Sequence, residues 1–209
     1  MARTKDGIFG DFSGKIGNVI GCKGKTGYYV RSRPQHVNNP QTERQQAHRG
    51  KFAVAMRFAR ALTPFLRISY REFAGAGHPF HAAVSSFLEN AVAETADGYA
   101  IDFEKALVSR GSLTAVHQAT SVQTANNISF EWTDNSGEGN AVAADAALLL
   151  VFNKTRWEAV YSDATARRSD EKAELDIPKE WEKDELVTYL GFRSGDGETV
   201  ANSICFILK

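Results

Sequence analysis

Three glycines, at positions 21, 24 and 27, separate two short strand-like runs near the N-terminus, and this pattern limits what the chain can fold into. The runs, residues 16–20 and 27–30, are rich in the β-branched and aromatic residues that favour strands. Because glycine accepts the positive φ angles of a tight reversal, the pattern predicts a β-hairpin. An isolated hairpin buries too little apolar surface to be stable in water, so this one must lie against something else.

A helix is predicted to follow the hairpin, with two alternative start signals. Asn39 can cap a helix whose first residue is Pro40, or Thr42 and Gln45 can form a capping box. Beyond either start, apolar residues recur at three- and four-residue spacing and basic residues occupy the other faces. The apolar positions are Phe52, Ala55, Met56, Ala59 and Leu62, and the basic ones are Arg44, Arg49, Lys51, Arg57 and Arg60.

Pro64 is expected to break or kink this basic amphipathic helix, because proline lacks the N–H that a helix interior requires. A short continuation is expected over residues 65–73. The segment 75–79 contains glycines and a proline, which predicts a break in the chain's helical structure. A second helix is predicted over residues 80–93, and the apolar faces of the two helices can close on each other.

Beyond residue 98 the hydrophobic period changes from helical to two, and turn residues become frequent. The predicted strands span residues 105–110 with a continuation to 117, 127–132, 146–153, 156–161, 172–177, 185–193 and 199–208. Short strands at this spacing are typical of an antiparallel β-sandwich of the immunoglobulin or fibronectin type III kind. We therefore predict an α+β protein, with a β-hairpin and helices in residues 1–98 and an immunoglobulin-like β-sandwich in residues 99–209.

The predicted sandwich has an identifiable core. Trp132 lies early in the set of strands, where such a sandwich keeps a core tryptophan. The charged segment 163–174 is predicted to be a solvated edge or a long loop. The expected core strands are those that contain Leu148, Leu150, Phe152, Val187 and Tyr189.

Formal charge is divided unevenly along the chain, although the net charge is zero. Residues 1–72 hold fourteen Lys and Arg against four Asp and Glu, a net charge of +10, so the rest of the chain carries −10. This asymmetry suggests a polyanionic partner for the basic part, or head-to-tail contact between the basic and acidic parts of neighbouring subunits. Solvation of exposed faces is the third interpretation.

The N-terminus lacks the continuous apolar stretch of an export signal, and no run approaches the roughly 18 apolar residues of a membrane helix. We therefore expect a cytoplasmic or particle-associated protein with no membrane partner. Cys22 and Cys205 are then expected to remain reduced thiols.

Two stretches resemble ligand loops. Gly24, Lys25 and Thr26 match the end of a phosphate-binding loop, but position 19 is valine and a predicted strand follows where a helix is required. Residues 134–145 place oxygen-bearing side chains in the manner of an EF-hand loop, which leaves calcium binding open. Val142 cannot ligate at the ninth place, so a polar turn between strands is the simpler interpretation.

No enzyme class is indicated by the sequence. The chain lacks the Gly-x-Ser-x-Gly motif of serine hydrolases, and Cys22 has no recognisable partner base. His78 and His81 lack an evident third metal ligand. We therefore predict a non-enzymatic protein with no cofactor, metal or small-molecule substrate.

The remaining candidate site is the basic, tyrosine-containing N-terminal stretch. Basic residues interleaved with aromatic ones can bind the phosphates of a nucleic acid, or the carboxylates of a neighbouring subunit. No helix-turn-helix, zinc-finger or RNA-binding motif accompanies them. The candidate contacts for assembly or for a polyanion are Lys15, Lys23, Lys25, Tyr28, Tyr29, Arg31, Arg33, Arg44 and Arg49.

Several short motifs together resemble a family of uncharacterised proteins widespread in Bacteroidota genomes. They are SGKIGNVIG at residues 13–21, Arg31-Ser32, Asn39-Pro40-Gln41-Thr42 with Gln45 and Phe52, and WTDNSG at residues 132–137. The resemblance covers nearly the whole chain and implies no catalytic residues. The N-terminal part is also similar to short blocks in phage and prophage proteins, some of them virion components, although His48 and Gly50 interrupt the helix start that those blocks share.

Taken together, these features predict a structural or assembly protein that forms a homo-oligomer through its basic N-terminal segment. That segment would dock on, or be exchanged between, the C-terminal sandwiches. The alternative is a nucleic-acid-binding protein that uses the basic N-terminal half.

Overall fold

The computed structural model describes residues 3–4, 11–36, 39–96, 98–163 and 165–208, and it divides the chain into two compact units. Met1–Thr42 is called the N-terminal unit and Glu43–Lys209 the body. The division falls between residues 42 and 43, not at residue 98, because the helices pack on the C-terminal strands and share a core with them.

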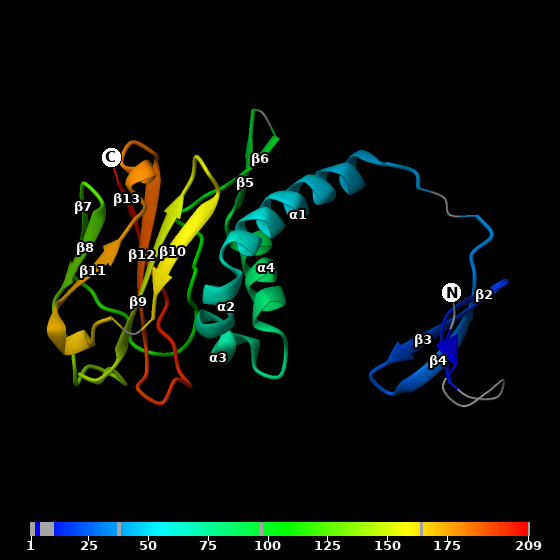
Figure 1. Ribbon diagram of the computed structural model, residues 1–209, viewed down its shortest axis with the longest axis horizontal. Coiled ribbons are helices and arrows are strands. Elements are labelled where there is room, and N and C mark those ends of the chain that lie inside the picture. Colours follow the sequence, from blue (N-terminus) through cyan, green and yellow to red (C-terminus); the bar gives the residue numbers. More distant parts are fainter. Residues whose placement is uncertain (1–2, 5–10, 37–38, 97, 164, 209) are drawn as a thin grey trace. The chain divides into compact units, whose positions relative to one another are not determined.

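The N-terminal unit is an antiparallel sheet in the order β1 (Arg3–Thr4), β2 (Phe12–Ile16), β3 (Val19–Gly24) and β4 (Gly27–Ser32) (Figure 1). The predicted hairpin is therefore part of a larger sheet, and its turns lie elsewhere than expected. Ile16 pairs with Val19 and Gly24 with Gly27, so the chain reverses at residues 17–18 and 25–26. Gly17 has a φ of +56°, which suits the first central position of a tight hairpin turn, whereas Gly21 lies inside β3.

The helical part of the body consists of α1 (Glu43–Ala61), α2 (Thr63–Ser69), α3 (Arg71–Ala74) and α4 (Pro79–Asn90). α1 begins directly after Thr42, the residue that the capping-box alternative places at the cap. The alternative start at Pro40 is wrong, because residues 40–42 are not helical. Pro64 lies in the first turn of α2, where its missing N–H has no partner to lose, so the predicted break is confirmed.

The strands of the body are β5 (Val92–Thr95), β6 (Gly98–Ile101), β7 (Ala119–Thr124), β8 (Asn127–Trp132), β9 (Ala146–Asn153), β10 (Glu158–Ser162), β11 (Lys172–Asp176), β12 (Leu186–Arg193) and β13 (Ile204–Ile207). β5 and β6 form a hairpin, and the others form two antiparallel sheets with the orders β10-β9-β12-β13 and β11-β8-β7. Short 3-10 helices span Arg168–Asp170 and Lys179–Trp181. β8 and β9 have the predicted bounds, whereas β5, β6 and β7 were not predicted.

The prediction of a strand over residues 105–110 with a continuation to 117 is wrong. This segment is a loop whose backbone N–H groups find single partners on several elements, with no ladder of its own. The Val108 N–H donates to Ser203 Oγ at 2.9 Å, and the Arg110 N–H donates to the Ser69 carbonyl at 3.2 Å. Because these partners already satisfy the backbone, the apolar residues of the loop can be buried without a strand.

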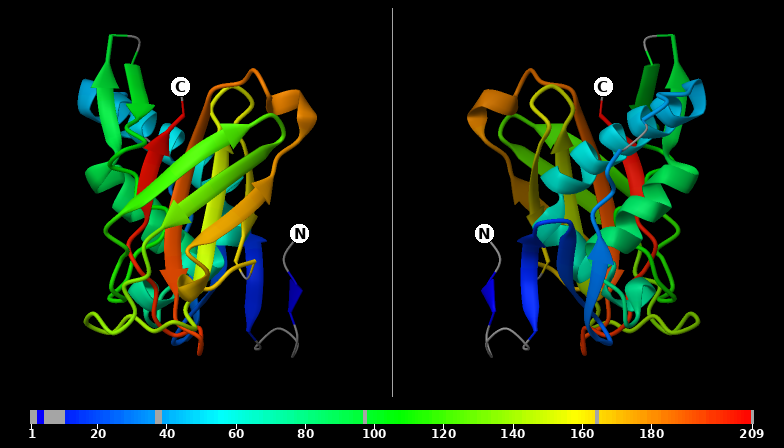
Figure 2. Two further views of the ribbon diagram at one scale, coloured as in Figure 1. Left: turned by 90° about the vertical axis from the view of Figure 1, so that its left-hand side faces the viewer. Right: turned by 90° about the vertical axis from the view of Figure 1, so that its right-hand side faces the viewer.

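β9 lies between the two hydrophobic cores of the body and contributes side chains to both. Its side chains alternate between two cores, so that Leu148, Leu150 and Phe152 face the helices while their neighbours at 147, 149 and 151 face β8 and β11. The two sheets therefore pack face to face, and the helices cover the other face of the larger sheet (Figure 2). Because both faces of β9 are covered, its sequence, AALLLVFN, is apolar almost throughout and does not alternate between apolar and polar residues.

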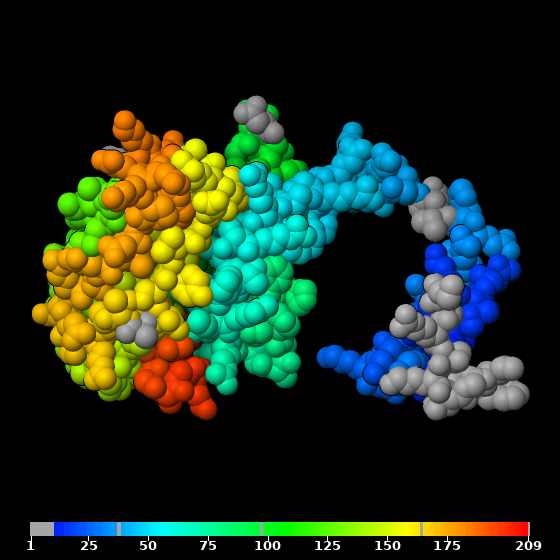
Figure 3. All heavy atoms as spheres, viewed as in Figure 1, coloured from blue at the N-terminus to red at the C-terminus, as the bar shows by residue number. Residues whose placement is uncertain are grey.

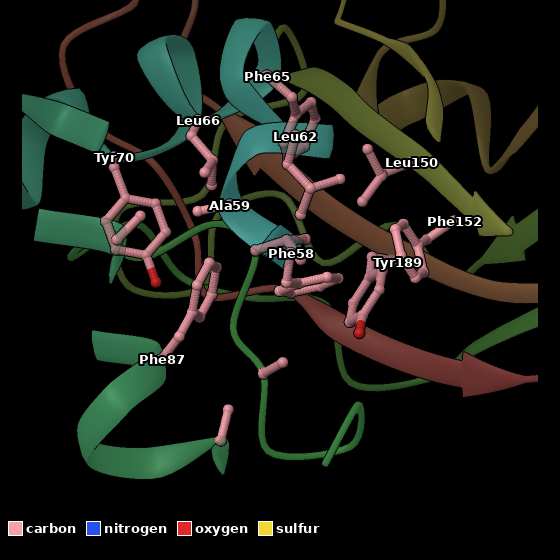
Figure 4. Packing of buried hydrophobic residues seen from close by; sticks show 14 of the residues in the cluster. Phe58, Ala59, Leu62, Phe65, Leu66, Tyr70, Phe87, Leu150, Phe152 and Tyr189 are labelled. Carbon is pink, nitrogen blue, oxygen red and sulfur yellow. The ribbon is translucent and has the colours of Figure 1, made fainter. Parts of the chain in front are cut away.

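Aromatic rings join the helical layer to the larger sheet. The Phe58 ring of α1 lies 5.1 Å from the Phe87 ring of α4 and 5.0 Å from the Phe152 ring of β9, between ring centroids (Figure 4). Tyr189 of β12 is buried in the same cluster, and its hydroxyl donates to the Phe103 carbonyl at 3.0 Å. In Figure 3 the helical residues lie directly against the residues of the sheet.

The second core lies between the two sheets and contains the predicted core tryptophan. Trp132 is 5% exposed, and its ring centroid lies 5.5 Å from that of Phe192. The Trp132 Nε1–H donates to the Arg168 carbonyl at 2.7 Å. The prediction that Trp132 is buried is therefore confirmed.

The charged segment 163–174 is largely exposed and leads into β11, an edge strand of its sheet, as predicted, but Arg168 within it is completely buried. Its guanidinium pairs with Asp145 at 3.1 Å, donates to the Thr114 carbonyl at 2.9 Å, and stacks 4.2 Å from the centroid of the Phe192 ring. A third donor bonds to the Asn135 side chain. This arrangement satisfies a buried charge with several partners, and the segment continues directly into β11.

Candidate interaction surface

The N-terminal sheet brings together five of the predicted contact residues and places them on two opposite faces. Lys15, Ile20 and Arg31 lie side by side across β2, β3 and β4, and Tyr29 pairs with Cys22 on the same face. We call this the basic face. Both Tyr29, at 54% exposed, and Arg31 are open to solvent.

The opposite face of the same sheet is mainly apolar. Strand alternation and register place one set of side chains there, which we call the apolar face: Phe12, Ile16, Val19, Lys23, Tyr28 and Val30. Val30 is 60% exposed, Ile16 51%, Tyr28 40% and Val19 37%. The Lys23 ammonium lies 5.6 Å from the centroid of the Tyr28 ring, so the predicted basic residue covers an aromatic one.

Phe12 is the side chain that folds over this face. A Cβ added at Gly21 would lie 2.6 Å from the Phe12 ring and 2.2 Å from its carbonyl oxygen, so β3 needs glycine at this point. The glycine that was expected to make a turn therefore allows close packing of a ring on the sheet. Phe12, Ile16, Val19 and Val30 were not predicted as contacts, although the alternation of apolar residues along the strands was the signal that could have found them.

The other predicted residues lie outside the sheet's faces. Lys25 is in the turn between β3 and β4, and the Arg33 N–H donates to the Asn18 carbonyl at 2.7 Å, which closes the end of the sheet. Arg44 and Arg49 lie on α1 and so belong to the body. The predicted set is thus divided between the two units.

The two ligand-loop patterns take other roles in the structure. Lys25 and Thr26 form a hairpin turn that leads into β4, whereas phosphate binding by such a loop needs a helix at this point. In the EF-hand-like stretch, Asp145 is 1% exposed and pairs with Arg168, so its carboxylate faces the core. Among the described residues there is no group of three or more His, Cys, Asp and Glu side chains that could hold a metal ion.

The body carries a second exposed aromatic surface. Phe52, predicted on the apolar face of the helix, is 40% exposed and lines a groove with Met56, Arg60 and Trp157. The Arg57 guanidinium stacks 4.1 Å from the centroid of the Trp157 ring. The first half of α1 therefore contributes little to the core, which begins at Ala55.

The comparisons with known proteins place the chain in a family. A model of a family of unknown function, DUF6266, matches residues 11–207. The chain belongs to this family. The match spans both the N-terminal sheet and the body of this family member, and it confirms the resemblance to a family without an assigned function. No curated protein and no solved structure matches the chain.

The family description supplies no site residue, so function must be argued from the surface of this member. Every helix among the described residues is too short or too polar to cross a bilayer. What distinguishes the molecule is the N-terminal sheet, whose large apolar side chains remain exposed on a small four-stranded unit.

Proposed function

We propose that this protein is a non-enzymatic structural or assembly protein that self-associates through its N-terminal sheet. The observation that carries the proposal is the exposure of Ile16, Val19, Tyr28 and Val30 on the apolar face. Apolar side chains gathered on one face of a folded unit commonly mark a protein interface. Covering the exposed part of each side chain would contribute about half of the roughly 1.5–3 kcal/mol that burial of a whole aliphatic or aromatic side chain is worth.

A second copy of the chain is the partner that charge favours. Residues 1–42 contain seven Lys and Arg against two Asp, a net charge of +5, and the remainder of the chain has −5. The N-terminal sheet of one copy is therefore attracted to the body of another. Such contacts can join subunits head to tail and build larger assemblies, which supports a role in a particle such as a phage virion.

We propose further that the two sheets of the body form a sandwich of the immunoglobulin or fibronectin type III kind. If β7 to β13 are lettered A to G, the sheets have the orders E-B-A and D-C-F-G. Immunoglobulin constant domains have A-B-E-D and C-F-G, so the arrangements differ in the sheet that the fourth strand joins. The core tryptophan also lies on strand B here, whereas antibody domains keep theirs on strand C.

Light scattering coupled to size-exclusion chromatography tests self-association of the full chain. We expect an oligomer that a double substitution of the apolar face, Ile16→Thr and Val19→Thr, dissociates. Threonine keeps the β-branch that strands favour, so the sheet itself is retained. Val122→Thr is the matched control, because Val122 is 58% exposed on β7, in the three-stranded sheet of the body. A wild-type chain that is monomeric at both low and high salt would overturn the proposal.

The second candidate function is nucleic-acid binding by the basic face. Lys15 and Arg31 flank Ile20 there and Tyr29 is exposed beside them, an arrangement that can hold phosphates and stack a base. Fluorescence anisotropy with a random single-stranded DNA tests it. Binding that weakens steeply with salt and is lost in Lys15→Gln/Arg31→Gln would support it, and no binding at low salt excludes it.

A further inference from the structure

β4 forms an open edge of the N-terminal sheet. The strand order is β1-β2-β3-β4, so one side of β4 pairs with β3 and no other strand pairs with its second side among the residues that the structure describes. All six residues of β4, GYYVRS, are exposed. Exposed edge strands of this kind present backbone donors and acceptors to any strand that can join them.

The register shows which backbone groups of β4 point outward. The Arg33 N–H donates to the Asn18 carbonyl, and antiparallel pairs alternate between hydrogen-bonded and non-hydrogen-bonded. By this alternation the groups of Arg31 and Tyr29 point toward β3, where their partners are Ile20 and Cys22. The N–H and C=O groups of Tyr28, Val30 and Ser32 therefore point away from the sheet.

These outward groups are self-complementary. When two β4 strands run antiparallel with Val30 opposite its counterpart, Tyr28 of each copy lies opposite Ser32 of the other. All the outward N–H and C=O groups of these three residues then find partners. A register centred on Tyr29 would leave Ser32 without a strand residue opposite it, because it would face the turn at residues 25–26.

The side chains fit the same register. Arg31 is the charged residue of β4, and it would lie opposite Tyr29 of the second copy on the basic face. A guanidinium beside an aromatic ring is favourable, whereas two arginines opposite each other would be destabilising. On the apolar face, Val30 would meet Val30 of the second copy and extend the apolar surface across both sheets.

We propose that β4 pairs antiparallel with β4 of a second copy, with Val30 opposite Val30, so that two N-terminal sheets form one continuous sheet. This inference rests on the proposed self-association and adds a second contact, between the edges of two N-terminal sheets, to the contact made by the apolar face. Each of the two N-terminal units carries a net positive charge, so salt strengthens this contact by screening the repulsion between them. Contact between a basic sheet and an acidic body would instead weaken with salt.

Disulfide trapping in the full-length chain tests the register. In a chain with Cys22→Ser and Cys205→Ser, a cysteine introduced by Val30→Cys would face its counterpart at about 5.5 Å between Cα atoms, within the range that a disulfide bridges. Oxidation with copper phenanthroline should make the linked dimer the main species on a non-reducing gel. In the same background Tyr29→Cys is the matched control, because its counterpart is offset by two positions along the strand.

The possible results separate the two proposals. A linked dimer from Tyr29→Cys in place of Val30→Cys overturns this register. If neither variant links while light scattering still shows an oligomer, edge pairing is overturned and the self-association of the chain stands. A wild-type chain that is monomeric at every salt concentration overturns both.

A proline provides a second test that leaves the fold of one copy intact. The Val30 N–H points outward, so Val30→Pro removes a contact between copies while the hydrogen bonds to β3 remain. We expect Val30→Pro to lose the dimer and Val30→Ile, which keeps the N–H, to retain it. Equal oligomeric states for the two variants would overturn the proposal.

Discussion

The N-terminal sheet and the larger sheet of the body are both antiparallel and four-stranded, yet they differ in what covers them. In the body, helices lie on one face and a second sheet on the other, so that Phe152 of β9 is completely buried. In the N-terminal unit, Tyr29 and Val30 of β4 are 54% and 60% exposed. The body therefore covers both faces of its larger sheet within one chain, whereas the N-terminal sheet leaves large apolar side chains exposed.

The same strand-forming residues can therefore either stabilise a fold or remain exposed on its surface. β-branched and aromatic residues form strands in either place, because local preference depends little on what lies above the sheet. Whether another element packs on the sheet decides if these side chains stabilise the fold or remain available for binding. The following predictions test this contrast, from the largest expected effect to the smallest.

Arg168→Met should destabilise the body by about 3–5 kcal/mol, because it leaves the buried Asp145 carboxylate without its charge partner. Urea unfolding followed by tryptophan fluorescence measures this, since all three tryptophans lie in the body. The double substitution Arg168→Met/Asp145→Leu should recover part of the loss by removing the unpaired charge. A loss below about 1 kcal/mol for the single variant would contradict the prediction.

Cys205 should react slowly with iodoacetamide in a Cys22→Ser chain. Burial disfavours its thiolate and raises the pKa of the thiol to about 11. An ordinary cysteine has a pKa of about 8.5, so at pH 8 the reactive thiolate should be roughly 200-fold scarcer than in the unfolded chain. Mass spectrometry of the alkylated protein in buffer and in urea gives the ratio, and similar rates in the two conditions would contradict it.

Tyr189→Phe should cost the body about 1 kcal/mol, because it removes the hydroxyl that donates to the Phe103 carbonyl. Urea unfolding measures the change. Tyr161→Phe is the matched control, since Tyr161 is 37% exposed on the edge strand β10, and its stability should stay within about 0.5 kcal/mol of the wild type. Equal losses in the two variants would show that the buried hydrogen bond has no special weight.

Gly21→Ala should disrupt the N-terminal sheet and leave the body unchanged. The new Cβ would collide with the Phe12 backbone and ring, whereas Gly24→Ala meets the Tyr29 ring at an ordinary 3.4 Å and serves as the control. Hydrogen exchange should rise in residues 11–33 of the first variant alone. The urea stability of the body should change by less than about 0.5 kcal/mol, because neither core of the body contains a described residue of the N-terminal unit. A larger change would break the contrast between the units.

The sequence predicted the most strongly patterned elements well. β8 and β9 have their predicted bounds, because β-branched and aromatic runs of this length, bounded by turn residues, leave few alternatives. The helical segments and the α+β class also follow from periodicity. In the N-terminal unit only β4 lies close to a predicted run, because the run 16–20 contains the reversal at residues 17–18 and β1 and most of β2 were not predicted. Three glycines offered several reversals, and packing under Phe12 decided the role of Gly21.

Other features depend on contacts that a single sequence does not reveal. Arg168 lies within a charged run, and its burial follows from Asp145, Asn135 and Thr114 converging on it from distant positions. The loop over residues 105–117 resembles a strand locally but finds its backbone partners on segments far along the chain. The candidate surface was predicted from its charges, while its apolar members were overlooked because they were counted as strand formers.

The central position of β9 has a consequence for how the body can change during evolution. Its even-numbered side chains belong to the helical core and its odd-numbered ones to the core between the sheets, so neither layer can be detached without placing half of the strand in water. The helices and the second sheet are thus not exchangeable modules, and the body should be inherited and lost as a whole. Residues 1–42, by contrast, form a compact unit of their own and could be gained or lost without exposing the cores of the body.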